Sequence, residues 1–166
     1  GTVLVKDIAA GSASSSPGAF TNIGGVLYFA ATDGTNGVEL WRSDGTTAGT
    51  TLVKDFTGDS GSSNPNNITE ANGRLYVVAT TLYGSEVWVA DLNPGDYNRN
   101  NSVDAADYVL WRHTLGSTSD LQANGDNTGA SAGVIDEADY AVWRSNFGRE
   151  LGAGSGEAEI GASIEA

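Results

Sequence analysis

The chain contains no cysteine and no methionine, and it has only 3 prolines and 1 histidine among 166 residues. The absence of cysteine excludes disulfides, thiolate catalysis and cysteine-based zinc sites. It leaves the compartment open, because a secreted protein can be stabilised by bound calcium instead. Basic residues are also scarce: 8 Lys and Arg stand against 21 Asp and Glu, which gives a formal net charge of −13. Nucleic acid and anionic membrane surfaces are therefore unsuitable partners, since both need a basic face.

No apolar run approaches the roughly 18 residues that a membrane-spanning helix needs. Glycine, by contrast, is abundant, with 23 residues, and this predicts many tight turns between short strands. The length fits one ordinary domain or two small ones. Because the chain starts at Gly1 without a signal peptide, we expect a processed product or a fragment of a longer protein.

The first half of the chain is an internal repeat with a period of 48 residues. Residues 1–7 (GTVLVKD) match residues 49–55 (GTTLVKD). After a one-residue deletion, the Glu-Leu-Trp run that begins at Glu39 matches Glu-Val-Trp beginning at Glu86. Repeats of about 40–50 residues are typical of propellers, solenoids and arrays.

Each repeat predicts about four short antiparallel strands, which is the content of one propeller blade. The strands expected in the first repeat cover residues 19–23, 26–31, 38–42 and 51–55, with a turn over 43–49. Residues 19–55 thus form one complete blade. Residues 2–8 are expected to be the last strand of an earlier blade, and residues 67–91 the first three strands of the next.

A single blade cannot bury both faces of its sheet. The region 1–91 is therefore either truncated or packs its two sheets together, and the sequence favours truncation. Residues 92–95 form a joint to the second half, which spans residues 95–149. Residues 151–166 are rich in Gly, Ala, Ser and Glu, and we expect a flexible tail there.

Residues 96–107 (DYNRNNSVDAAD) place oxygen side chains at positions 1, 3, 5, 9 and 12. A twelve-residue loop with this spacing wraps six to eight oxygens around a calcium ion. The predicted ligands are Asp96, Asn98, Asn100, the main-chain carbonyl of Ser102, Asp104 (directly or through water) and Asp107. Asn101 replaces the usual glycine at position 6, which is tolerable because Asn adopts positive φ. The alternative is a capped helix that begins at Asp104 or Asp107, but a cap explains one carboxylate and not the spacing.

A second loop follows, because the run Asp-x-Ala-Asp-Tyr-x-x-Trp-Arg that starts at Asp104 recurs at Asp136, 32 residues further along the chain. A strict twelve-residue frame puts Thr128 first and alanines at positions 3 and 5, which cannot bind. Four inserted residues restore a ligand set: Asn124, Asp126, Thr128, the carbonyl of Val134, Asp136 and Asp139, with Gly133 at the turn and Asn127 and Ser131 in reserve. This site has fewer carboxylates, so we expect it to bind calcium more weakly or to depend on the first.

Both loops are followed by a predicted helix with an aromatic stripe at spacing i, i+3 and i+7. The stripes are Tyr108, Trp111 and Leu115, then Tyr140, Trp143 and Phe147, and each helix stops at a glycine, Gly116 or Gly148. Packing of the two helices on each other explains the stripes, and a partner-binding face is the alternative. Arg112 and Arg144 near the helix ends can stabilise the dipoles, cover rings or contact a partner.

With two calcium loops and two helices in phase, residues 95–149 resemble a type I dockerin. The resemblance implies a small α-helical module that holds two Ca²⁺ ions and binds a cohesin-like protein domain. In that family, loop positions 10 and 11 and the following helix contact the partner, which implies contacts from Ala105, Ala106, Tyr108, Arg112, Glu137, Ala138, Tyr140 and Arg144. The Ser/Thr pairs common in the family are absent at these positions, so the resemblance does not identify the partner.

The first half resembles the bacterial ELWxxDGT repeat family, on residues 39–46 (ELWRSDGT) and a degraded copy at 86–91. This implies a β-rich, propeller-like surface protein without known chemistry. Trp41 and Trp88 are then blade core rather than platforms for stacking sugars. The fold class expected for the whole chain is α+β in two parts, antiparallel β repeats followed by the α-helical module.

The sequence predicts a binding protein rather than an enzyme. The lone His113 lies on a helix beside a calcium loop, and the carboxylates of the first half (Asp33, Glu39, Asp44 and Glu86) lie where turn and strand-edge roles suffice. We expect an extracellular or cell-surface protein that docks through calcium. The alternatives are a calcium-stiffened structural array, or a carbohydrate-associated protein that contacts glycan through its repeats or accompanies a catalytic domain elsewhere in its parent.

Overall fold

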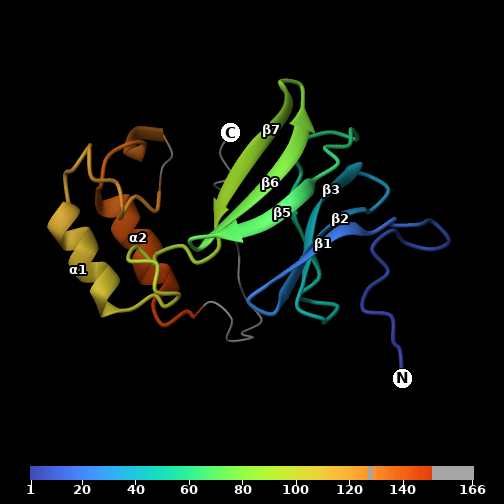
Figure 1. Cartoon of the computed structure of the whole chain (residues 1–166), viewed down its shortest axis with the longest axis horizontal. Helices are drawn as coiled ribbons and strands as arrows, with labels where there is room; N and C mark the ends of the chain where they lie inside the picture. The colour runs from blue at the N-terminus through green and yellow to red at the C-terminus, as the bar shows by residue number, and fades with distance from the viewer. Residues whose placement is uncertain (127–128, 151–166) are drawn as a thin grey trace.

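The computed structural model describes residues 1–126 and 129–150, so the expected tail at 151–166 lies outside the described residues. It shows two antiparallel sheets followed by two α-helices, which confirms the α+β class (Figure 1). The sheets are open, and the described residues form no closed propeller. No helix in this part of the chain is long and apolar enough to cross a membrane.

The first sheet has the order β1-β2-β3-β4, and the second has the order β5-β6-β7. The strands of the first are β1 (Gly18–Ile23), β2 (Val26–Thr32), β3 (Val38–Ser43) and β4 (Thr51–Lys54), and those of the second are β5 (Asn66–Ala71), β6 (Arg74–Thr81) and β7 (Gly84–Asp91). All strands predicted within the two repeats are confirmed. The strand predicted over residues 2–8 is not formed, because no neighbouring strand pairs with this segment.

The two sheets pack against each other and share one core. It combines Ile23, Tyr28, Leu40 and Phe56 from the first repeat with Ile68, Leu75, Val77, Ala79, Ala90 and Leu92 from the second. At the contact, the hydroxyl of Thr21 donates to the carbonyl of Ile68 at 2.8 Å. The structure therefore shows the packing of the two sheets that the sequence offered as one of two possibilities. Truncation of the repeat region stays a prediction.

Trp41 and Trp88 pack inside the β region, as predicted. Trp41 is 6% exposed and lies in a cluster with Phe29 and Ala31. Trp88 is half-buried and meets the ring of Phe56 edge-on, with 5.2 Å between ring centroids. Both rings thus contribute to packing between and within the sheets.

Glu39 is a fully buried carboxylate that joins β3 to the connection between the two sheets. It accepts hydrogen bonds from the backbone N–H of Phe56 at 3.1 Å, from the backbone N–H of Ser63 at 2.8 Å and from the Ser63 hydroxyl. Burial raises the pKa of Glu39 above its ordinary value, although these donors oppose the shift. Asp33 and Asp44 instead accept backbone N–H groups within their own turns.

The raised pKa of Glu39 makes the stability of the β region depend on pH. The folded state binds the proton more tightly than the unfolded chain, so this contribution is complete below the ordinary pKa of Glu. It is lost as the pH rises through the raised pKa. We expect urea unfolding of the wild type to gain stability on acidification relative to Glu39→Gln, which cannot titrate. Parallel pH profiles of the two proteins would contradict this.

The second half consists of α1 (Ala105–Thr114), a 3-10 turn η1 (Gly129–Ser131) and α2 (Glu137–Asn146). Both helices stop as predicted, because Gly116 and Gly148 adopt φ of +83° and +86°. This helical half lies beside the second sheet (Figure 1). At the contact, the guanidinium of Arg149 donates to the carbonyl of Leu92 at 3.2 Å.

Candidate metal centre

The two loop–helix units are joined by reciprocal hydrogen bonds. The indole N–H of Trp111 donates to the carbonyl of Asp136 at 2.8 Å, and that of Trp143 donates to the carbonyl of Asp104 at 2.8 Å. These carbonyls belong to the residues that cap the opposite helices. Each helix therefore holds the loop of the other unit, and the duplicated sequence forms one structural unit.

A second reciprocal set joins the helix ends to the loops. The backbone N–H of Gly116 donates to Ile135, and that of Gly148 donates to Val103, both at 2.8 Å. Val103 and Ile135 occupy the same position in their loops, and both are fully buried. Loss of order in one loop should therefore spread to the other.

Four aromatic rings fill the contact between α1 and α2. Ring centroids lie 5.0 Å apart for Trp111 and Tyr140, 5.2 Å for Tyr108 and Trp143, and 6.0 Å for Tyr108 and Tyr140. The predicted packing of the helices on each other is confirmed. Tyr108 remains 38% exposed, so part of the stripe also reaches the surface.

We expect Trp111→Phe and Trp143→Phe each to destabilise the helical half by about 1–2 kcal/mol, because each removes the indole N–H that joins one helix to the cap carbonyl of the other. The near-equal cost follows from the reciprocal geometry. Tyr140→Phe is the matched control, since its hydroxyl makes no hydrogen bond among the described residues. Chemical unfolding followed by helical circular dichroism measures all three; no loss in either Trp variant would contradict the role of these bonds.

In loop one (residues 96–107), side-chain oxygens accept hydrogen bonds from backbone N–H groups of the same loop. The carboxylate of Asp96 accepts from Asn100 at 3.0 Å and from Asn101 at 2.8 Å. The amide oxygens of Asn98 and Asn100 accept from Asn100 and Ser102 at 3.0 and 2.9 Å. Asn101 takes φ of +72°, the conformation predicted for it in place of glycine.

Asp107 closes loop one. It is fully buried, and its two carboxylate oxygens accept from the backbone N–H of Asn98 at 3.0 Å and of Asp104 at 2.8 Å. Asp104 is the N-cap of α1 and accepts from Ala106 at 2.7 Å. The capped-helix alternative is thus correct for Asp104, but the cap alone does not account for the bond between Asp107 and the loop's third residue.

Loop two (residues 124–139) is closed by the same pair of hydrogen bonds, made here by Asp139. Asp139 is fully buried and accepts from the backbone N–H of Asp126 and of Asp136, both at 2.8 Å. These bonds correspond to those of Asp107, which places Asp126 third in its loop and Asn124 first. The register that needs four inserted residues therefore has the geometry of loop one.

The rest of loop two lies around the insertion. Gly133 takes φ of +73°, as expected for a turn, and the backbone N–H of Val134 donates to the carbonyl of Ser131 at 3.1 Å. The Ser131 hydroxyl donates to Asp136 at 2.8 Å, so this reserve ligand already contacts a predicted one. The predicted ligand Thr128 and the reserve Asn127 lie outside the described residues.

The donor atoms fit calcium better than a softer metal. Among residues 1–126 and 129–150, no three His, Cys, Asp or Glu side chains converge in a metal-binding group. Loop one instead alternates carboxylates with the amides of Asn98 and Asn100, and calcium accepts amide and main-chain carbonyl oxygens beside carboxylates. Zinc prefers histidine and cysteine, which these loops lack.

The carboxylates carry a charge that a cation would offset. Burial raises the pKa of Asp96, and the nearby charge of Asp107 adds to the shift. Burial also raises the pKa of Asp139, with a further contribution from Asp136. Both loops thus hold negative charge under partial desolvation, which a bound cation relieves.

Two residues that the sequence analysis did not single out support the loops. The buried Tyr97 donates its hydroxyl to the carbonyl of Asp139 and so ties loop one to loop two. Asn93 is 5% exposed, and its backbone carbonyl accepts the backbone N–H of Asp96, the first residue of loop one, at 3.0 Å. An aromatic residue between two calcium-ligand positions was a signal for Tyr97, but its partner lies 42 residues away.

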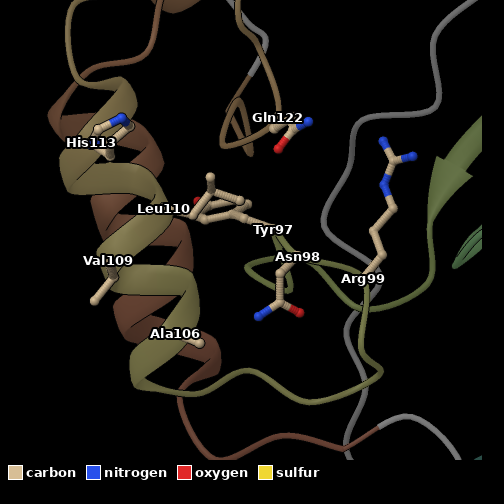
Figure 2. A pocket seen from close by; sticks show the side chains of 8 residues that line it. All are labelled: Tyr97, Asn98, Arg99, Ala106, Val109, Leu110, His113 and Gln122. Carbon is tan, nitrogen blue, oxygen red and sulfur yellow. The ribbon is translucent and has the colours of Figure 1, made fainter.

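The predicted partner-contact residues are distributed over both units. Ala105, Ala106, Glu137, Arg112 and Arg144 are exposed, whereas Ala138 and Tyr140 are half-buried. Beside this surface, an open hollow of about 540 Å³ lies between loop one and the outer face of α1 (Figure 2). Its lining includes Tyr97, Asn98, Arg99, Ala106, Val109, Leu110, His113 and Gln122.

Comparison with known proteins gives no relative: no protein-family model matches the chain, and neither the curated proteins nor the solved structures include a match. The resemblances to dockerins and to ELWxxDGT repeats stay predictions.

Proposed function

We propose that residues 95–149 form a calcium-dependent docking module of an extracellular or cell-surface protein and bind a cohesin-like protein domain. The observation that supports this most strongly is the shared closure of the two loops. In each, a buried Asp accepts the backbone N–H of the third loop residue and of the helix cap. The bond to the helix cap belongs to a capping box, whereas the bond to the third loop residue recurs in two loops of unequal length and supports a duplicated ion-binding device.

Loop one would hold the ion through Asp96, Asn98, Asn100, the carbonyl of Ser102, Asp104 and Asp107. Loop two would use Asn124, Asp126, Thr128, the carbonyl of Val134, Asp136 and Asp139. Bound calcium supplies positive charge that offsets the carboxylates, and it favours the folded loops because the unfolded chain offers no such site. The Trp111 and Trp143 bonds would then convey loop order to both helices.

The docking surface would consist of the residues that follow each loop, of which Ala138 is half-buried and Ala105, Ala106 and Glu137 are exposed. Ala105 and Ala106 begin α1, and Glu137 and Ala138 begin α2. The hollow beside α1 adds Val109, which is 64% exposed. An apolar side chain of a partner fits such a hollow, whereas Arg112 and Arg144 provide cations at the rim.

The test has two steps. Tryptophan fluorescence should show a higher melting temperature in calcium than in magnesium or chelator, since Trp111 and Trp143 sit beside the loops. Binding to a panel of cohesin domains should then require calcium and be lost in Ala106→Arg or Ala138→Arg. Stabilisation without any binding would favour the structural array instead, and no calcium effect would contradict both.

A further inference from the structure

The second sheet lacks the fourth strand that completes the first. In the first sheet, β4 covers the edge of β3, with Trp41 paired to Leu52 and Leu40 to Lys54. In the second, β7 is the repeat counterpart of β3, and no described residue pairs with its outer edge. An open edge of 8 residues presents unpaired N–H and C=O groups to other strands.

This open edge is also apolar. Val87, the counterpart of the fully buried Leu40, is 61% exposed. The turn that leads into β7 adds Leu82 and Tyr83, which are 85% and 78% exposed. Natural proteins usually protect a long edge with charged side chains, proline or a covering segment; β7 contains no lysine or proline, and Glu86 is its exposed charged residue.

The chain carries a segment that matches the missing strand. Residues 1–7 (GTVLVKD) repeat residues 49–55 (GTTLVKD), which contain β4. In this structure the segment forms no strand, and Val3 and Leu4 are 84% and 79% exposed. Within residues 1–126 and 129–150, a strand-forming sequence without a partner strand and a strand edge without a covering strand are therefore both present.

The residues after this segment already lie as they would after a fourth strand. The carbonyl of Ser15 accepts the backbone N–H of Thr32 at 3.0 Å, and the carbonyl of Ser63 accepts that of Thr80 at 2.8 Å. Ser15 thus enters the first sheet as Ser63 enters the second. Ser63 lies in the connection between β4 and β5, where its backbone N–H donates to Glu39. The stretch before Ser15 therefore resembles the connection that follows a fourth strand.

One chain cannot make this pairing within itself. Figure 1 shows the N-terminal segment and β7 on opposite sides of the β region, with both sheets between them. The segment is also held at its own first sheet, where Lys6 donates to the carbonyl of Thr50 and Thr47 donates to the carbonyl of Val5, both at 2.7 Å. An N-terminal segment that pairs with β7 therefore has to come from another copy of the chain.

We propose that β7 binds residues 3–6 of a second copy of this chain as a fourth strand, which joins copies head to tail. The register of β3 and β4 transfers directly, so Leu4 pairs with Trp88 and Lys6 pairs with Val87. Such an interface is heterologous, so it builds rings or open chains.

Analytical ultracentrifugation of the whole chain tests the proposal at physiological salt, which screens repulsion between chains of net charge −13. The wild type should associate as its concentration rises. Leu4→Asp spoils only the donor segment and Val87→Lys only the acceptor edge; both side chains are exposed in the single chain, so neither should affect folding. Each variant alone should associate about tenfold more weakly or not at all.

The decisive sample is an equimolar mixture of the two variants. Val87→Lys retains an intact donor and Leu4→Asp an intact acceptor, so the mixture should form a dimer and stop there. Circular dichroism of each variant confirms that it is folded. A wild type that stays monomeric at all concentrations, or one whose association both variants leave unchanged, would overturn the proposal.

Discussion

Replacing Asp107 with alanine is expected to cause the largest loss in the helical half. The substitution removes both acceptors for the backbone N–H groups of Asn98 and Asp104, and it deletes the carboxylate that closes loop one. Unpaired partly buried N–H groups cost about 1–3 kcal/mol each, so the calcium-free protein should lose about 2–4 kcal/mol. The calcium affinity of loop one should fall by more than the roughly 10–100-fold that loss of an outer-shell partner causes.

Urea unfolding with and without calcium separates these two effects. Asp120→Ala removes an exposed carboxylate outside both predicted ligand sets, so it is the control for net charge. Asp139→Ala should reproduce the loss of stability in loop two, because its carboxylate has the same two kinds of partner. If Asp107→Ala unfolds like Asp120→Ala and keeps its response to calcium, the assignment of the closing residue is wrong.

In the β region, the largest effect is expected from Glu39→Ala. The substitution leaves the backbone N–H groups of Phe56 and Ser63 without acceptors inside a fully buried site and opens a cavity beside β3. We expect a loss of about 2–4 kcal/mol, less than the number of bonds suggests because burial of the carboxylate already has a cost.

Glu86→Ala is the matched control for this prediction. Glu86 holds the same place in the repeat signature, but it is exposed, and no described residue donates a hydrogen bond to it as Phe56 and Ser63 do to Glu39. Its replacement should change the free energy of unfolding by no more than about 0.5 kcal/mol. Equal losses of unfolding free energy in the two variants would contradict this prediction. They would show that the glutamate acts within its own strand and not through its hydrogen bonds to Phe56 and Ser63.

The strands and helices could be predicted because their signals are local. Alternating apolar residues mark β3, and the glycines after each aromatic stripe mark the ends of α1 and α2. Packing of the two sheets was one of two alternatives that the sequence left open, and the contacts that form it could not be predicted, since the bond from Thr21 to Ile68 joins residues 47 apart. The segment at residues 2–8 failed for the opposite reason. Its local pattern is that of a strand, but a strand also needs a neighbour, and the described chain provides none.

The same distinction between local and long-range signals applies to the candidate site. The spacing of oxygen side chains predicted the turn at Asn101 and the inserted register of loop two, because both depend on positions within one loop. The hydrogen bonds by which Trp111, Trp143 and Tyr97 join the two loop–helix units were not predicted. Each bond joins residues that are distant in sequence, and the local pattern of one loop–helix unit does not indicate how that unit packs against the other.

The most direct test of the account is calcium titration calorimetry on the whole chain, followed by circular dichroism of the calcium-free and loaded forms. The account predicts two binding events, the stronger in loop one, with helix gained on loading and the first event absent in Asp107→Ala. A single event that survives Asp107→Ala would contradict the assignment of loop one. No heat at millimolar calcium would contradict calcium-dependent docking itself.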